Sequence, residues 1–151
     1  MLPEVSAALA ILVDDIEVLL TFADGRDAAA LNWRPAPGAN SLIALATHTV
    51  GAAEQALITN LCDARPTERD RDAELATQGD SLEELRAHWD GLRHELAAAL
   101  ERVSAARLDA TIHHPRLGDM SGHTLLLTAL THAREHLAHA GLTAQLLDAR
   151  A

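Results

Sequence analysis

Residues 131–139 read Thr131-His132-Ala133-Arg134-Glu135-His136-Leu137-Ala138-His139 and belong to a long segment with helical periodicity. Because a helix repeats every ~3.6 residues, His132 and His136 fall on one face with Cβ atoms roughly 5–6 Å apart, and His139 continues that stripe. Two imidazole nitrogens in this arrangement can bind one metal ion. Zinc-type catalytic sites commonly use three protein ligands and leave a fourth position open. The stretch therefore predicts one wall of a metal site and requires a third ligand from elsewhere in the chain.

The helix that carries this stretch is expected to span residues 121–148. Its apolar residues recur in steps of four and three, as in the seam of a helix that packs in a bundle. They are Leu126, Leu130, Ala133, Leu137, Ala140, Ala144 and Leu147. The histidine stripe lies one position to the side of this seam, which places it at the margin of the core.

Three earlier segments show the same helical spacing of apolar residues, and we expect helices over about 3–22, 40–62 and 81–105. Ser81 and Glu84 form a predicted capping box at the start of the last of these. Aromatic residues make up only 2% of the chain, and Ala and Leu dominate over the β-branched residues of strands. With 151 residues, the chain has the size of one domain. We therefore predict a single all-α domain, residues 1–151.

The connections between these helices are expected to be long. Two prolines and two glycines interrupt residues 24–38. The charged stretch 65–72, closed by residues 78–80, is expected to be a mobile surface loop. Residues 106–122, with one proline and two glycines, are expected to form a long crossing loop.

His48 is the candidate for the third ligand. It lies in the second turn of the helix expected over 40–62, and its face carries Ala44, Gly51 and Gln55 at helical offsets. A glycine inside a helix costs about 1 kcal/mol relative to alanine, so Gly51 indicates close packing or a required space. Cores of helical bundles are places where facing helices bring metal ligands together.

The remaining histidines are not expected to bind the metal. We expect His88 and His94 at solvated surface positions, His113 and His114 in a loop, and His123 at the exposed start of a helix.

The composition excludes several classes of function. A formal net charge of -10 argues against nucleic-acid binding, since such proteins usually display a clustered basic face. Cys62 is the only cysteine, so no intramolecular disulfide forms, and a small buried apolar role is expected for it. No signal peptide is evident, and no segment approaches the ~20 apolar residues of a membrane span. We expect a cytoplasmic protein that contacts neither membranes nor nucleic acids.

Three stretches resemble the DinB-like (DinB/YfiT-like) superfamily of metalloenzymes. They are Asn-Trp-Arg-Pro-Ala-Pro-Gly-Ala-Asn-Ser at 32–41, Thr-His-Thr-Val-Gly at 47–51, and the histidine-rich stretch at 132–139. The resemblance covers essentially the whole chain. It implies a four-helix bundle with one metal-binding histidine on the second helix and a pair four residues apart on the last, which corresponds to His48, His132 and His136.

The resemblance also implies a divalent metal ion, usually zinc or nickel, and a homodimer. Members with assigned roles look like enzymes that use a low-molecular-weight thiol, including bacillithiol S-transferases and a mycothiol-dependent maleylpyruvate isomerase. This chain departs from relatives that end in His-Arg-Gly-Gln, since it has His139-Ala140-Gly141-Leu142. Alignment on that ending would make Glu135 and His139 the ligands instead.

The leading hypothesis is an enzyme for a small-molecule substrate, a transferase or a hydrolase, in which three histidines hold one divalent metal. A metal in such a site can create a nucleophile at neutral pH. Glu135 or His139 would then act as general base or orient a ligand. The alternative is a non-catalytic helical module in which a metal or the histidines only stabilise the bundle or a dimer.

Overall fold

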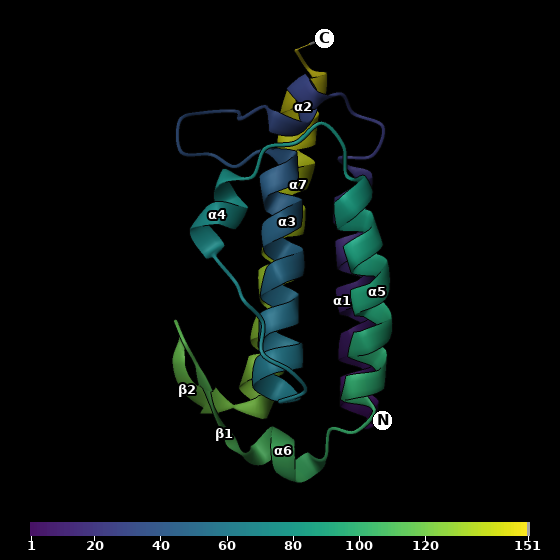
Figure 1. Cartoon of the computed structure of the whole chain (residues 1–151), viewed down its shortest axis with the longest axis vertical. Coiled ribbons are helices and arrows are strands. Elements are labelled where there is room, and N and C mark those ends of the chain that lie inside the picture. Colours follow the sequence, from purple (N-terminus) through teal and green to yellow (C-terminus); the bar gives the residue numbers. More distant parts are fainter. Residues whose placement is uncertain (151) are drawn as a thin grey trace.

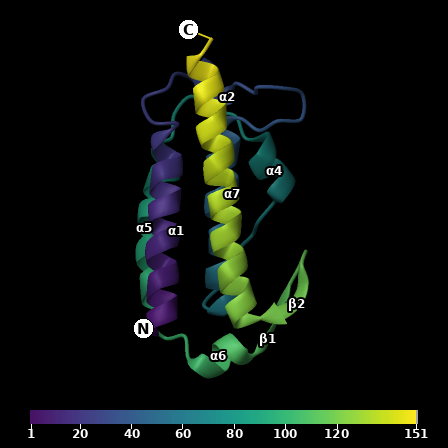
Figure 2. The same cartoon turned by 180° about the vertical axis from the view of Figure 1, so that it is seen from behind.

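Four long helical segments run along the longest axis of the molecule in a computed structural model, which describes residues 1–150 (Figure 1). They are α1 (Pro3–Thr21), α3 (Leu42–Ala53) with its continuation as the π-helix η1 (Glu54–Leu61), α5 (Glu83–Leu100) and α7 (Gly122–Asp148). In Figure 1, α3 and α5 lie in front of α7 and α1, and Figure 2 shows α1 and α7 side by side from behind. The four helices expected from the sequence are present, with ends that differ by a few residues.

The predicted apolar seams form the core between these helices. The buried seam of α5 consists of Trp89, Leu92, Leu96 and Ala99. On α7 the alanines of the seam are buried, and the leucines at 130, 137 and 147 are partly buried and pack against the core. Burial of this apolar surface is the main favourable contribution to folding. The helix positions that carry the histidine stripe are fixed by the same packing.

Five short elements fill the connections. They are α2 (Ala28–Asn32), α4 (Arg71–Ala76), α6 (Ala105–Asp109), β1 (Thr111–His114) and β2 (Gly118–Ser121). The fold is therefore mostly helical, and the expectation of a purely helical chain is wrong in this one region.

The predicted crossing loop contains an antiparallel hairpin. Strand β1 pairs with β2 in a register that joins Thr111 to Ser121 and His114 to Gly118. Gly118 has a φ of 79°, which suits a residue without a Cβ at the end of the turn. Alternate residues of β1 are buried, Ile112 and His114 among them, so the short strand is stabilised by its contact with the helices.

Two further local predictions are wrong. The segment expected to be an irregular loop carries α4, whose N-cap Asp70 accepts hydrogen bonds from the backbone amides of Asp72 and Ala73. Helix α5 begins at Glu83 after Leu82, and no side chain caps it, so the capping box is absent. Leu82, which occupies the N-cap position, is buried.

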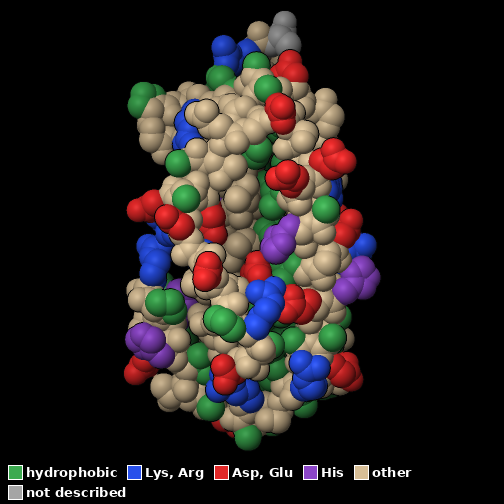
Figure 3. All heavy atoms as spheres, in the orientation of Figure 1, with side chains coloured by type: hydrophobic (Ala, Val, Ile, Leu, Met, Phe, Trp, Pro, Cys, Tyr) green, Lys and Arg blue, Asp and Glu red, His purple; other side chains and the backbone are tan. Residues whose placement is uncertain are grey.

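The charged side chains are distributed over the surface. Figure 3 shows the acidic groups spread over the face that carries α4 and α5, with arginines among them. No helix within residues 1–150 is long and apolar enough to cross a membrane.

Candidate metal site

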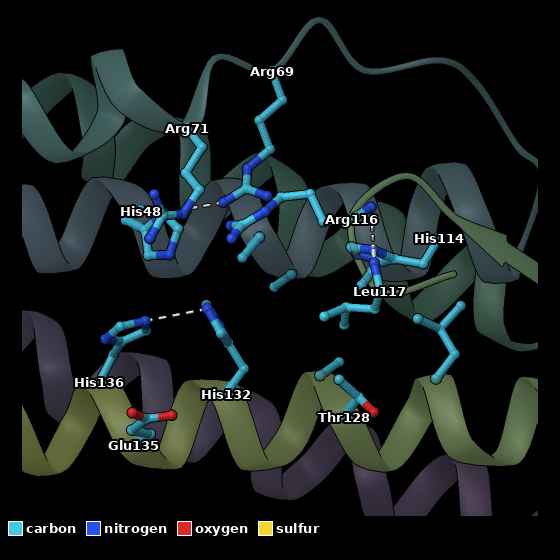
Figure 4. A pocket seen from close by; sticks show the side chains of 15 residues that line it. His48, Arg69, Arg71, His114, Arg116, Leu117, Thr128, His132, Glu135 and His136 are labelled. Carbon is cyan, nitrogen blue, oxygen red and sulfur yellow. Dashed lines mark hydrogen bonds between the residues drawn. The ribbon is translucent and has the colours of Figure 1, made fainter. Parts of the chain in front are cut away.

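The structure brings His48, His132 and His136 into one cluster. One ring nitrogen from each residue lies within 4.8 Å of the other two. The Nε2 atoms of His132 and His136 are 3.1 Å apart, and the ring of His48 meets both others edge to face, with centroids 5.1 and 5.0 Å away. Three imidazoles from two helices thus converge on one point (Figure 4).

Packing of α3 against α7 creates this convergence. His132 and His136 are one turn apart on α7, and the small buried Ala133 between them belongs to the seam of that helix. His48 is on the buried side of α3, with only 3% of its surface exposed. Its neighbour Ala44 is fully buried, so the helices approach closely enough for the rings to meet.

The environment keeps the pair on α7 uncharged. Burial, reinforced by the charges of neighbouring imidazoles, lowers the pKa of His132 to about 3 and that of His136 to about 4. At neutral pH both rings are therefore neutral and have a lone pair available, which is the state in which histidine binds metal.

Glu74 supports His48 from the side away from α7. Its Oε2 lies 2.9 Å from His48 Nδ1, and Arg69 Nη2 lies 3.0 Å from the same nitrogen. Because Arg69 Nη2 also donates to Glu74 Oε2 at 2.8 Å, the carboxylate is the acceptor for both groups in the tautomer with the proton on His48 Nδ1. The remaining nitrogen, Nε2, is then left with its lone pair. A carboxylate that accepts from the second nitrogen of a ligating histidine is a recurrent feature of metal sites.

Arg69 holds this carboxylate in place. Its Nε and Nη2 donate to Glu74 Oε1 and Oε2, both at 2.8 Å, and its Nη1 donates to Gln55 at 3.0 Å. Burial alone would raise the pKa of Glu74, but the hydrogen bonds from His48 and Arg69 outweigh burial and lower it. Glu74 is thus an anion that is oriented before any metal binds.

Gly51 provides the space that this arrangement needs. It lies three residues after His48 on α3, and a Cβ built at position 51 would overlap the carboxylate of Glu74. The unfavourable glycine inside a helix is therefore explained by the close approach of α4, and the prediction of close packing at Gly51 is confirmed.

The residues present fit a divalent metal ion of the zinc type. Nitrogens at roughly 2.0–2.1 Å from a tetrahedral ion are ~3.3 Å apart, and the Nε2 atoms of His132 and His136 are already 3.1 Å apart. His136 Nδ1 is buried and has no hydrogen-bond partner within residues 1–150. The other nitrogen of this ring, Nε2, faces His132 and is the one available to a metal ion.

A pocket of about 310 Å³ opens beside the cluster. Its wall combines the three histidines with arginines and small apolar residues from α3, η1 and α7. Its size is at the lower end of small-molecule sites, which are roughly 300–1,000 Å³.

The other residues named from the sequence take different positions. Glu135 is exposed and lines the pocket, whereas His139 is exposed on the next turn, its ring centroid 5.8 Å from that of His136. Neither of them belongs to the three-histidine cluster. No other group of three potential ligands this close together is found within residues 1–150.

The remaining five histidines lie outside the cluster. His88, His94 and His123 are exposed, as expected. His113 is exposed on β1, while His114 is buried and lines the pocket. The pocket role of His114 was not foreseen.

Sequence reasoning also missed the residues that come from the segment 65–76. The sequence predicts a mobile loop for the charged stretch 65–72, which contains Arg69 and Arg71, and gives no role to Glu74. Gly51 is the one indication in the sequence, because a glycine on the same helix face as His48 leaves a space that a side chain from another segment can fill. Nothing local identified Glu74 as that group.

Comparison with known proteins places this arrangement in context. The family model of the DinB superfamily matches residues 11–140. A solved structure described as a conserved protein from Enterococcus faecalis has a TM-score of 0.76 and 16% identity, and the match covers 99% of each chain. At this identity the likeness concerns the fold alone. No curated protein matches the chain.

Proposed function

Because this chain belongs to the DinB superfamily, whose family model matches residues 11–140, we propose that it is a metal-dependent enzyme for a small-molecule substrate. His48, His132 and His136 would hold one divalent ion, zinc or nickel. The convergence of these three neutral imidazoles beside an open pocket is the observation that carries the proposal.

A divalent ion in this site would act as a Lewis acid and favour the deprotonated form of a bound water or thiol near neutral pH. The protein's own groups prepare the site. Glu74 fixes the ring of His48 and, through its negative charge, increases the basicity of that imidazole. Arg69 keeps Glu74 ionised and in one orientation.

Glu135 is the proposed proton acceptor. It is exposed, lines the pocket and immediately precedes His136 in the chain. A carboxylate in this position can take a proton from a substrate in the pocket, as general base catalysis requires. The role of general base predicted for His139 has less support, because His139 is one turn farther along α7 and does not line the pocket.

The finer features of the proposal come from the family resemblance. They are a low-molecular-weight thiol as co-substrate, S-transfer or hydrolysis as the reaction, a homodimer, and the arrangement of α1, α3, α5 and α7 as a four-helix bundle. The neutral histidine cluster supports the thiol, because zinc-type ions bind thiolate readily.

Metal analysis of the purified protein tests the proposal. We expect about one equivalent of zinc or nickel per chain, lost in His48→Ala, His132→Ala and His136→Ala variants. His88→Ala is the matched control, since His88 also contacts a carboxylate, Glu54, at 2.9 Å but does not belong to the cluster. Unchanged metal content in all three cluster variants would refute the site.

Stability measurements separate an enzyme from a structural module. If the cluster variants lose the metal and also unfold, and a screen of thiols with electrophilic substrates gives no turnover, the non-catalytic role is supported instead. Variants that lose the metal but stay folded support a catalytic site.

A further inference from the structure

Three arginines line the pocket beside the histidine cluster, namely Arg69, Arg71 and Arg116. The chain has 12 basic residues and 22 acidic residues, so this concentration of cations runs against its overall charge. Figure 4 shows the three side chains reaching from the α4 and hairpin side toward the space opposite His132.

Only Arg69 is neutralised by a buried carboxylate. It makes two hydrogen bonds to Glu74, each 2.8 Å long. The ion pair of Arg71 is a 3.4 Å contact to Asp72, whose side chain is 94% exposed. Such an exposed pair contributes little, so Arg71 is in effect an uncompensated cation.

Arg71 also has a donor that nothing in the protein satisfies. Its Nε is buried and has no hydrogen-bond partner within residues 1–150. A buried donor of this kind costs free energy unless a ligand accepts from it. Arg71 lines the same pocket as His132 and His136.

Arg116 is at the tip of the hairpin and is similarly free. Within residues 1–150 it makes a hydrogen bond through its backbone amide, to His114 Nδ1 at 3.2 Å, and its guanidinium takes part in no ion pair. Arg71, with its one exposed ion pair, and Arg116 thus place two positive charges on one wall of the pocket.

His114 adds a neutral donor on the same side. Its Nδ1 accepts from the backbone amides of both Arg116 and Leu117, at 3.2 Å each. The ring proton is therefore on Nε2, which can donate a hydrogen bond. His114 is only 9% exposed and lines the pocket, so its orientation is fixed by the hairpin.

Apart from Glu135 and Thr128, the rest of the pocket wall is apolar. Ala53, Ala56, Leu125 and Ala129 form buried parts of the wall. Asp70 and Asp72 line a neighbouring surface pocket together with Arg71 and Arg116, but Glu135 is the one carboxylate in the wall of this pocket. The pocket therefore combines excess positive charge with a small apolar surface.

From these contacts we infer that the substrate is a small organic anion with an apolar body, whose carboxylate or phosphate group is bound by Arg71 and Arg116, with His114 as a further donor. The inference rests on the proposed function, because it supplies the substrate class for the same pocket. Arginine is suited to such groups, since its planar guanidinium can donate two parallel hydrogen bonds to one anion. The anion would occupy the hairpin side of the pocket and present the rest of the molecule to the three histidines.

Titration with two simple anions tests the binding of the charged group by itself. Metal-loaded protein is titrated with sodium propionate and, separately, with sodium phosphate at constant ionic strength, while the arginine Nε–H signals are followed by NMR. We expect saturable shifts for Arg71 and Arg116 but not for Arg93, which is half-buried on α5 and paired with Asp90. Tighter binding of propionate would indicate a carboxylate substrate, and tighter binding of phosphate a phosphate ester. The absence of saturable shifts with both anions would overturn the inference.

A pair of thiols tests whether the charged group and the metal site act on one molecule. Cobalt-loaded protein is titrated with 3-mercaptopropionate and with 3-mercaptopropionamide, and the cobalt–thiolate absorption is recorded. We expect the carboxylate to bind at least about tenfold more tightly than the amide, because charge-assisted hydrogen bonds are the stronger class. In the variant with Arg71→Gln and Arg116→Gln the two thiols should bind equally, whereas Arg93→Gln should preserve the preference.

These outcomes distinguish failure of the inference from failure of the proposed function. Equal binding of both thiols to the wild-type protein with bound cobalt would overturn the anion site and leave the metal site intact. If the wild-type protein binds no cobalt, the proposed function fails, and the propionate and phosphate titrations, performed on the metal-free protein, still decide whether Arg71 and Arg116 bind anions.

Discussion

Replacement of Glu74 by glutamine probes the support of the proposed metal site. Glutamine has nearly the same volume, and its carbonyl oxygen can still accept the proton of His48 Nδ1, now 2.9 Å from the carboxylate. The negative charge is lost, and with it the two-bond ion pair to Arg69. Glu74→Gln therefore removes the charge behind His48 without emptying the space.

The expected effect on metal binding is substantial. Loss of a carboxylate that supports a histidine ligand weakens metal binding about 10- to 100-fold, which corresponds to roughly 1.4–2.7 kcal/mol. The fold should also be less stable. The side chain of Arg69 is only 9% exposed, and removal of one partner from a buried ion pair costs about 3–5 kcal/mol, of which the remaining bond to Gln55 offsets a part.

Competition with a chromophoric chelator measures the metal affinity, and circular dichroism at the same temperature establishes that the variant is folded. Glu54→Gln is the control, because Glu54 also contacts a histidine, His88 at 2.9 Å, and an arginine, Arg65 at 2.6 Å. We expect weaker zinc binding for Glu74→Gln and unchanged binding for Glu54→Gln. A folded Glu74→Gln protein with wild-type affinity would refute the role assigned to this carboxylate.

Three further predictions concern space, protonation and reactivity. Gly51→Ala should weaken zinc binding about tenfold, since the new Cβ overlaps the Glu74 carboxylate, and the increase of about 1 kcal/mol in the free energy of unfolding expected from helix propensity should be absent. Chelator competition measures the affinity and urea unfolding the stability, and an unchanged zinc affinity would contradict the steric reasoning. The metal-free protein should lose stability as pH falls from about 6.5 toward 4, because the pKa values of His132 and His136 in the folded protein, about 3 and about 4, lie below the ordinary value of 6.5. In this range only the unfolded chain takes up the two protons, so the free energy of unfolding falls by up to about 1.4 kcal/mol per pH unit for each histidine. Urea titrations should show a shallower decline for a variant with His132→Gln and His136→Gln. Burial raises the pKa of Cys62 from 9.0 to about 11, so the fraction of thiolate at neutral pH falls roughly a hundredfold. Iodoacetamide should therefore label the native protein far more slowly than the urea-unfolded protein, and equal labelling rates would show that the thiol is not protected.

The main helices and half of the candidate site follow from local patterns. Helical periodicity identified the four long helices because their apolar seams are continuous over several turns. His132 and His136 were recognisable as a pair because residues four apart on a helix are neighbours. His48 required a further indication, the small residues on its helix face and the family resemblance.

The second half of the site depends on contacts between segments distant in sequence. Glu74 reaches His48 across 26 positions, and the helix that carries it has six residues, too short to show a periodic pattern. The hairpin that presents His114 and Arg116 has strands of four residues each, and its stability comes from packing against the helices. Residues of this kind are visible only when the three-dimensional structure brings them to the pocket.

X-ray absorption spectroscopy of the metal-loaded protein tests the three-histidine site most directly. A site formed by His48, His132 and His136 predicts a first shell with imidazole nitrogens at roughly 2.0–2.1 Å and multiple scattering that corresponds to three imidazole rings. In the His48→Ala variant the number of rings should fall to two, or the metal should be lost. A shell with two imidazoles and a carboxylate oxygen, as His48, Glu135 and His139 would provide, or a shell that is the same in wild type and His48→Ala, would contradict the site.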